Sequence, residues 1–405
     1  APLASEGRMF VSGENSIVCV DSYHGTEYWQ LDAPNSQRYS MPYDCGYFSV
    51  DADRFALAVQ GAAWIVDAAT GEVEKRIPAP AADNASSVHW GYLALQGDHV
   101  FGSIQKPTAS RTAPSRDQID RDYGNARPTV TGDALFRLNV DTQRVVWRHD
   151  ALVLNPTIAV ANNCVYLVAA ADASLHEHPT GRVGLSELLA GGATVTALDA
   201  QSGAVMWEQA LDSYMARCNN ILYLQATEEY VILSGSYVRE NDSWYRVAVL
   251  DAKSGANVWT AEHKKNKPGE FTHGEQVHHP VVLDDRLVCE PVIYELPTGR
   301  RIGPDGEADS WTLVRPAHSC GTMSGAGNCL FFRSANPTVM DLSSESHGPD
   351  RFRSISPSRP GCWINIIPAD GLVLIPEASA SCVCHYSLQT SMAFQPVPRK
   401  AARDR

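Results

Sequence analysis

The sequence predicts an all-β fold, an eight-bladed β-propeller of four-stranded antiparallel blades. A phrase made of an apolar strand, an Asp- and Gly-containing turn and a second strand that often ends in Trp recurs along the 405 residues. Short apolar or alternating runs bounded by turn residues are typical of β-hairpins, and no segment keeps the 3.6-residue periodicity of an amphipathic helix. Repeats of this kind indicate blades arranged around an axis.

The phrase appears eight times, and each copy is expected to form the two outer strands of one blade. An upstream pair of strands, such as the one that includes residues 230–237, would supply the inner half. The Asp and Gly suit the tight turn between the outer strands, and the Trp is expected to cover the contact with the neighbouring blade. Ring closure leaves no long exposed sheet edge. The clear copies lie at 18–29, 64–75, 136–147, 196–207 and 248–259, and the weaker ones at 293–302, 338–352 and 384–394.

We expect one domain over residues 1–405, with insertions at 105–132 and 172–192. The second insertion is expected to include a short helix. Loops of this length in compact domains tend to be functional lids or disordered segments. The arginine-rich first insertion could cover an anionic ligand, or could be a solvated loop.

Composition excludes some partners and indicates a compartment. The formal net charge of −13 provides no basic field for a nucleic-acid backbone, and no apolar run approaches the length of a transmembrane helix. The first ten residues lack the regions of a signal peptide, so we expect a mature chain or a part of a longer one. Ten cysteines without paired CxxC motifs are compatible with disulfides in an oxidising, extracytoplasmic compartment.

The segments "LDAQSGAVMW" at 198–207 and "LDAKSGANVW" at 250–259 resemble the PQQ-like propeller repeat. That repeat is shared by quinoprotein alcohol dehydrogenases and the bacterial outer-membrane assembly lipoprotein. Residues 90–111, 273–282, 318–333 and 359–391 are similar to PQQ-binding-like repeat proteins of planctomycetes and related bacteria, which are often parts of larger extracytoplasmic chains. The resemblance implies the propeller architecture, and it leaves activity open because one repeat serves both enzymes and scaffolds.

Polar and titratable side chains recur where the chain enters the innermost strand of six consecutive blades, three to eight. Because these entrances surround one axis, we expect the side chains to form a ring around a single funnel, a typical ligand site. The entrances carry His89 and Trp90, Asn155, Tyr214 with Arg217, His278 with His279, His318 with Cys320, and Arg359 with Cys362, Trp363 and Asn365.

The favoured interpretation is a carbohydrate-active enzyme that cleaves a uronate-containing polysaccharide by β-elimination. This reaction needs a cation or hydrogen-bond donor for the carboxylate and a His or Tyr to move protons. The candidate catalytic residues are His89, Tyr214, Arg217 and His279. The candidate substrate-binding residues are Trp90, Asn155, His278, His318, Arg359, Trp363 and Asn365.

Three alternatives remain open. His279, His318, Cys320 and Cys362 could bind zinc or copper, although disulfides between neighbouring strands would use the same cysteines. A calcium-dependent quinone enzyme is the second alternative, but we expect no PQQ because the entrances carry His and Cys instead of acidic calcium ligands. The third is a non-catalytic propeller scaffold for protein or ligand binding. The expected partner is a saccharide or another small polar ligand, together with any further domains of a longer chain.

Overall fold

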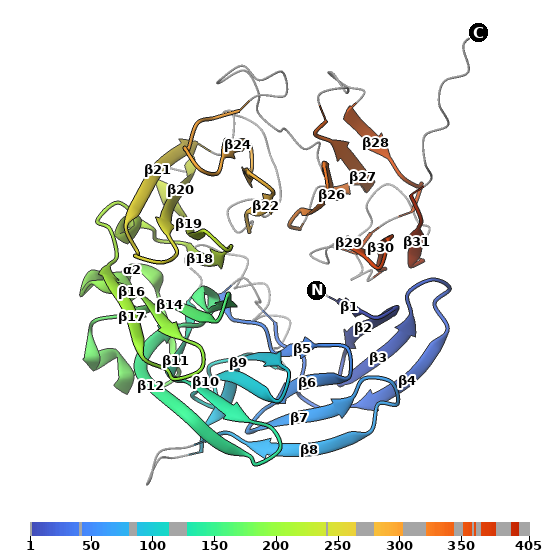
Figure 1. Cartoon of the computed structure of the whole chain (residues 1–405), viewed down its shortest axis with the longest axis horizontal. Helices are drawn as coiled ribbons and strands as arrows, with labels where there is room; N and C mark the ends of the chain where they lie inside the picture. The colour runs from blue at the N-terminus through green and yellow to red at the C-terminus, as the bar shows by residue number, and fades with distance from the viewer. Residues whose placement is uncertain are drawn as a thin grey trace.

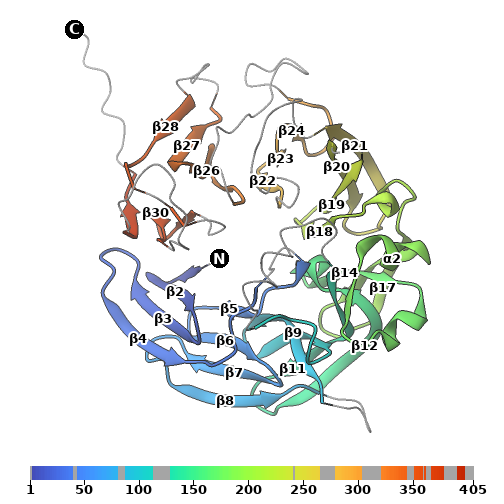
Figure 2. The ribbon, with the colours of Figure 1, turned by 180° about the vertical axis from the view of Figure 1, so that it is seen from behind.

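The computed structural model describes residues 2–39, 43–80, 87–112, 128–239, 242–264, 279–302, 321–343, 351–358, 360–361, 366–377 and 390–396. Antiparallel sheets follow one another around a central axis, so that β29 lies beside β1 and closes the ring (Figures 1 and 2). Within these residues each of eight blades has three or four strands. The predicted all-β, eight-bladed propeller is confirmed.

The first four blades each have four strands, numbered from the axis outward. Blade one contains β1 (Leu3–Ser5), β2 (Arg8–Gly13), β3 (Ser16–Asp21) and β4 (Glu27–Asp32). Blade two contains β5 (Phe48–Val50), β6 (Arg54–Val59), β7 (Ala62–Asp67) and β8 (Val73–Pro78). Blade three contains β9 (His89–Gln96), β10 (His99–Gln105), β11 (Thr129–Asn139) and β12 (Arg144–Leu154). Blade four contains β13 (Ala159–Ala161), β14 (Cys164–Ala170), β16 (Ala193–Asp199) and β17 (Val205–Ala210).

The remaining blades follow the same order. Blade five contains β18 (Ile221–Ala226), β19 (Tyr230–Arg239), β20 (Asp242–Asp251) and β21 (Asn257–Lys264). Blade six contains β22 (Val281–Leu283), β23 (Arg286–Cys289) and β24 (Val292–Glu295). Blade seven contains β25 (Ser324–Ala326), β26 (Cys329–Ser334), β27 (Asn336–Asp341) and β28 (Phe352–Ser354). Blade eight contains β29 (Ile367–Ala369), β30 (Leu372–Ile375) and β31 (Met392–Phe394).

The turn of the repeated phrase is held by its aspartate. In blade two, Oδ1 of Asp67 accepts hydrogen bonds from the backbone N–H groups of Ala69 (3.0 Å) and Thr70 (2.7 Å). The Thr70 hydroxyl donates to the same oxygen, and these bonds lower the pKa of the Asp67 carboxyl. Asp199 and Asp251 make the same contacts in blades four and five. The predicted role of the aspartate is therefore confirmed.

In the four copies that end in Trp, this tryptophan joins its blade to the next. Its indole N–H donates to a backbone carbonyl in the turn of the following blade, and its ring lies against the glycine of that turn. The four bonds are Trp29 to Ala68 (3.1 Å), Trp147 to Ala200 (3.0 Å), Trp207 to Ala252 (2.9 Å) and Trp259 to Leu296 (2.7 Å). The expected contact between blades is confirmed in these copies.

The insertion at 172–192 includes the predicted short helix, α2 (Leu185–Ala190), whose three leucines are buried. Just before it, β15 (Arg182–Val183) pairs with β11. Of the insertion at 105–132, residues 113–127 lie outside the described residues. Among the residues that the structure describes, no helix has the length and apolar character required to span a membrane.

A buried histidine should make stability depend on pH. His263 on β21 is buried, its Nδ1 lies 2.7 Å from the Tyr294 hydroxyl, and burial lowers its pKa to about 4. The unfolded chain would bind this proton near pH 6.5, so the histidine's contribution to stability is complete above about pH 6.5 and is lost as the pH falls toward 4. We expect the free energy of unfolding to fall by up to about 3 kcal/mol across this window from this group.

Urea unfolding at pH 7, 5.5 and 4 would measure this dependence. His263→Gln should show a shallower fall than the wild type, because glutamine has no proton to gain. Equal pH slopes for the two proteins would contradict the assignment.

Candidate functional site

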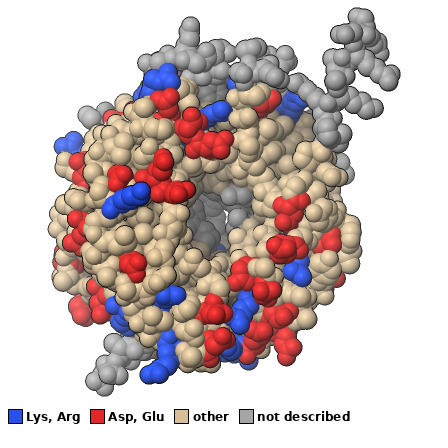
Figure 3. Space-filling model, in the orientation of Figure 1, with Lys and Arg blue, Asp and Glu red and all other residues tan. Residues whose placement is uncertain are grey.

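The connector between β4 and β5 links blades one and two, and it also contacts blade five across the ring. Tyr43, from this connector, is buried against Ile221 and Tyr223 of β18 in blade five. Its hydroxyl donates to Oδ1 of Asn220 at 3.0 Å. The space-filling view shows the central opening of the ring (Figure 3). The chain's own connector therefore supplies part of the packing next to the innermost strands.

A buried ion pair anchors the same connector to blade three. The Arg38 and Asp44 side chains are 3% and 1% exposed, and Nη1 of Arg38 lies 3.5 Å from Oδ1 of Asp44. The guanidinium also donates to the backbone carbonyls of Gly91 (2.9 Å) and Trp90 (2.7 Å). Two buried charges are tolerable when they are paired and hydrogen-bonded in this way.

A chain of side-chain hydrogen bonds extends from this ion pair to blade four. Asn155 donates to Gln105 (3.0 Å), Gln105 donates to Ser110 (2.7 Å), and Ser110 donates to Oδ2 of Asp44 (2.6 Å). The Ser103 hydroxyl donates to Oδ1 of Asn155 at 3.1 Å. We call these residues, with Arg38, the connector network. These four side-chain bonds all run in one direction and end at the carboxylate of Asp44.

Three candidate residues from the sequence lie in or beside the connector network. Asn155, in the 3₁₀ turn η2 (Asn155–Thr157), is 1% exposed, and both ends of its amide have protein partners. Trp90 is 0% exposed and donates from its indole nitrogen to the Ile77 carbonyl (3.1 Å), so it packs as a core residue. His89 begins β9 and is half-buried, and burial and then the charge of Arg38 lower its pKa.

His279 lies next to the innermost strands of blades five and six. Its ring centroid is 4.6 Å from that of Tyr223, and the amide N–H of Gln225 donates to its Nδ1. The same amide nitrogen donates to the Pro280 carbonyl at 2.8 Å. Burial lowers the pKa of His279, which favours the neutral ring. Nδ1 of His279 also lies 3.1 Å from the Pro280 carbonyl oxygen.

Tyr214 has its contacts on the other strands of blade five. The guanidinium of Arg246 on β20 lies between the rings of Tyr214 (4.5 Å) and Tyr237 (4.1 Å), and its Nε donates to Glu262 at 2.8 Å. Burial, followed by the charge of Glu262, raises the pKa of Tyr214 to about 12. Arg217, at the end of η4 (Met215–Arg217), is exposed. Among the described contacts, none joins Tyr214 or Arg217 to His89 or His279.

The other candidate residues lie outside the described residues: His278, His318, Cys320, Arg359, Cys362, Trp363 and Asn365. Of the tentative metal ligands only His279 is described. The described part of the chain contains no group of three His, Cys, Asp or Glu that could hold a metal ion. The six cysteines in that part are free thiols: Cys19, Cys45, Cys164, Cys218, Cys289 and Cys329.

An axial pocket of about 510 Å³ opens between the innermost strands of blades four to seven. Its described lining is neutral, with mostly apolar side chains from β13, β18, β22 and the start of β25. Gln225 is its main polar group, and Oε1 of this amide is buried without a hydrogen-bond partner among the described residues. The lining residues are Ala159, Leu224, Gln225, Ala226, Thr227, Pro280, Val281, Val282, Met323 and Ser324.

The axial pocket was missed from the sequence, which directed attention to His, Cys and Arg at the entrances. One signal could have indicated it: a glutamine near the end of the apolar run "ILYLQA" at 221–226, where β18 faces the axis. A polar side chain in an otherwise apolar, buried innermost strand requires a hydrogen-bond partner. Such a residue therefore marks a place where a ligand could supply that partner.

Comparison with known proteins extends the fold assignment. Residues 133–290 match the family described as outer membrane protein assembly factor BamB. The crystal structure of BamB from Moraxella catarrhalis is similar with a TM-score of 0.53 and 14% identity over 93% of this chain and 92% of that one.

A europium-containing methanol dehydrogenase is similar with a TM-score of 0.51 and 11% identity, over 93% of this chain and 80% of that chain. No match was found among curated proteins. At these identities the two structures show the fold alone. Together with the match over residues 133–290, they support a PQQ-like β-propeller repeat in this chain.

Proposed function

We propose that this protein is a non-catalytic propeller scaffold that binds a partner in the axial pocket. The observation that carries the proposal is the chemistry of the pocket's described lining, which has no acid, base or cation. Proton abstraction beside a carboxylate needs a base and a charge-stabilising donor within reach of the substrate. A neutral, mostly apolar lining with one unsatisfied amide oxygen is suited to binding.

The size and polarity of the axial pocket support this function. Its volume of about 510 Å³ falls within the range of about 300–1,000 Å³ that is usual for ligand pockets. Apolar walls from Leu224, Val281 and Met323 suit an apolar group, and Oε1 of Gln225 suits an N–H or O–H donor. The matched family's description as an outer membrane protein assembly factor is consistent with a scaffold in an extracytoplasmic compartment.

A peptide selection tests the scaffold proposal. Peptides selected from a displayed random library for binding to the wild-type protein should lose about tenfold in affinity in Gln225→Leu, because the acceptor is removed while the volume is kept. Fluorescence anisotropy with a labelled selected peptide measures this change. Gln30→Leu, which changes an exposed glutamine on the outer strand β4, should bind like the wild type. Equal affinities in all three proteins would contradict binding at this pocket.

A polysaccharide lyase is the second candidate, and one observation favours it: neutral His279 contacts Gln225 at the edge of the axial pocket. If the protein cleaves uronate-containing polysaccharides, His279→Ala and Arg217→Ala should abolish cleavage while the thermal unfolding midpoint stays nearly unchanged. The ultraviolet absorbance of the unsaturated product measures cleavage. Such a result would overturn the scaffold proposal, whereas early unfolding of both variants would show that the two residues are structural.

A further inference from the structure

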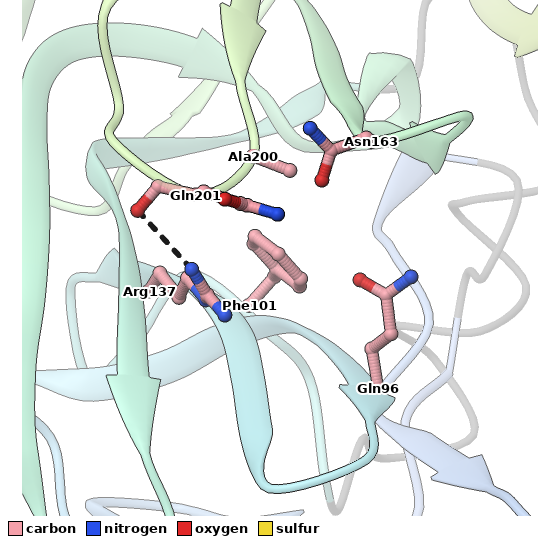
Figure 4. Close-up of a pocket in the computed structure, with 6 residues that line it drawn as sticks. All are labelled: Gln96, Phe101, Arg137, Asn163, Ala200 and Gln201. Carbon is pink, nitrogen blue, oxygen red and sulfur yellow. Dashed lines mark hydrogen bonds between the residues drawn. The ribbon is translucent and has the colours of Figure 1, made fainter.

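A second pocket, of about 230 Å³, lies between blades three and four at the opposite end of β9 from His89 (Figure 4). We call it the Arg137 pocket. Phe101 of β10 and Ala200 lie in its wall, and both are buried. The amide side chains of Gln96, Asn163 and Gln201 complete the lining from three separate turns or strand ends.

Arg137 of β11 is the charged residue of this lining, and its guanidinium lies over the Phe101 ring, 5.8 Å from the ring centroid. Its Nη1 donates to the backbone carbonyl of Gln201 at 3.1 Å. Its Nε is buried and has no hydrogen-bond partner within the described residues. No carboxylate of those residues forms an ion pair with it. The nearby Asp199 uses Oδ1 to hold its own turn, where it accepts from the N–H groups of Gln201 and Ser202.

A half-buried guanidinium that has no carboxylate partner among the described residues favours the binding of an anion. A buried N–H that lacks an acceptor is destabilising, and a hydrogen bond to a charged acceptor is stronger than one to a neutral carbonyl. The fork of guanidinium N–H groups matches the two oxygens of a carboxylate. Removal from bulk water also strengthens the attraction between the two charges.

The three amides of the lining indicate which other groups the ligand carries beside its carboxylate. Gln96, Asn163 and Gln201 are exposed, and their amides carry both donors and acceptors. The Asn163 amide nitrogen donates to Oδ2 of Asp199 at 3.4 Å, which leaves its oxygen to accept from a ligand. Figure 4 shows these amides and the Arg137 side chain arranged around the Phe101 ring. This combination suits hydroxyl or amide groups beside the carboxylate, with a carbon face toward Phe101. The volume corresponds to roughly eight water molecules and therefore limits the ligand to the size of one sugar or one amino acid.

We propose that the Arg137 pocket binds a small carboxylate that carries further hydrogen-bonding groups, such as a sugar acid or the side chain of a peptide glutamate. The site is separate from the axial pocket: it is charged, it uses residues of blades three and four, and it shares no lining residue with that pocket. The proposal therefore does not depend on the scaffold function.

Isothermal titration calorimetry with four probes tests the proposal: glucuronate, glucose, N-acetylglutamate amide and its glutamine counterpart. We expect the wild type to bind at least one of the two acids and to bind its neutral counterpart at least tenfold more weakly. The acid that binds shows whether a sugar or a peptide supplies the carboxylate. Arg137→Met should weaken binding of that acid at least tenfold. Arg144→Met removes the same charge from an exposed position on β12 and should leave binding unchanged.

Two further variants keep the test decisive if Arg137→Met does not fold. Asn163 has a φ of +59°, a left-handed conformation that glycine adopts readily, so Asn163→Gly removes the amide and keeps the turn. Gln96→Ala removes another exposed amide. Each should weaken binding of the acid severalfold without changing thermal unfolding. No binding of either acid to the wild type, equal binding of acid and neutral probe, or unchanged binding in Asn163→Gly and Gln96→Ala would overturn the proposal.

Discussion

Asp44→Ala is expected to lower the free energy of unfolding by about 3–5 kcal/mol, the usual effect of removing one partner of a buried ion pair. The change leaves the buried guanidinium of Arg38 without its carboxylate, and it removes the acceptor at the end of the connector network. Urea unfolding at pH 7 measures the effect. Asp32→Ala, at an exposed position at the end of β4, is the matched control and should change stability little.

A double variant shows where the loss arises. Arg38→Met with Asp44→Leu removes both charges, so it should be more stable than Asp44→Ala alone. Recovery should be partial, because the carbonyls of Trp90 and Gly91 lose their donor. If Asp44→Ala unfolds at the same urea concentration as Asp32→Ala, the ion pair does not hold the connector in place.

Trp207→Ala should lower the free energy of unfolding by about 3–5 kcal/mol, as for other large aromatic side chains removed from a core. The indole of Trp207 packs against Gly255 in the next blade and donates to the Ala252 carbonyl, so the substitution leaves a cavity between blades four and five. Thermal and urea unfolding measure the loss. Val205→Ala, on the same strand and half-exposed, is the control and should cost less than about 1 kcal/mol.

Substitution of Gly255, which packs against Trp207, tests the same contact between blades four and five independently. Gly255 has a φ of +72°, and a Cβ there would lie 2.6 Å from Cε3 of Trp207. Gly255→Ala should therefore be destabilising through both backbone strain and steric overlap. In the Trp207→Ala background the overlap with the indole is absent, although the contact with Cγ of Gln209 (2.9 Å) remains, so Gly255→Ala should cost less there than in the wild type. Additive effects of the two substitutions would contradict direct packing between these residues.

Much of the architecture could be predicted because its determinants are local. Asp67, Asp199 and Asp251 each hold their own turn within three residues, and Gly71 in the turn of Asp67 adopts a left-handed conformation. Eight copies of one phrase indicate the number of blades, since each copy supplies the two outer strands of one blade. A short helix was also predicted within the insertion at 172–192, and α2 confirms it.

The candidate site could be predicted only in part, because side chains at equivalent places in the repeat have different surroundings. Asn155 lies just before the innermost strand β13, but its amide forms hydrogen bonds within the connector network. Tyr214 precedes an innermost strand in the same way, yet it stacks on Arg246 on the third strand of its blade. Distance along the chain does not reveal how far a connector runs across a blade before it reaches the axis.

The sequence alone determined the propeller, its blade order and the turn and Trp contacts, because hydrogen bonds within a turn and strand periodicity depend on neighbouring residues. The tertiary structure alone decided which polar groups meet. Tyr43 and Asn220 are 177 positions apart, and the ring brings them within hydrogen-bond distance. Gln225 and Arg137 each retain a buried polar atom without a partner in the described residues, and no spacing in the sequence distinguishes them from satisfied neighbours. Desolvation depends on packing from several blades at once, so only the folded ring establishes where a ligand could be held.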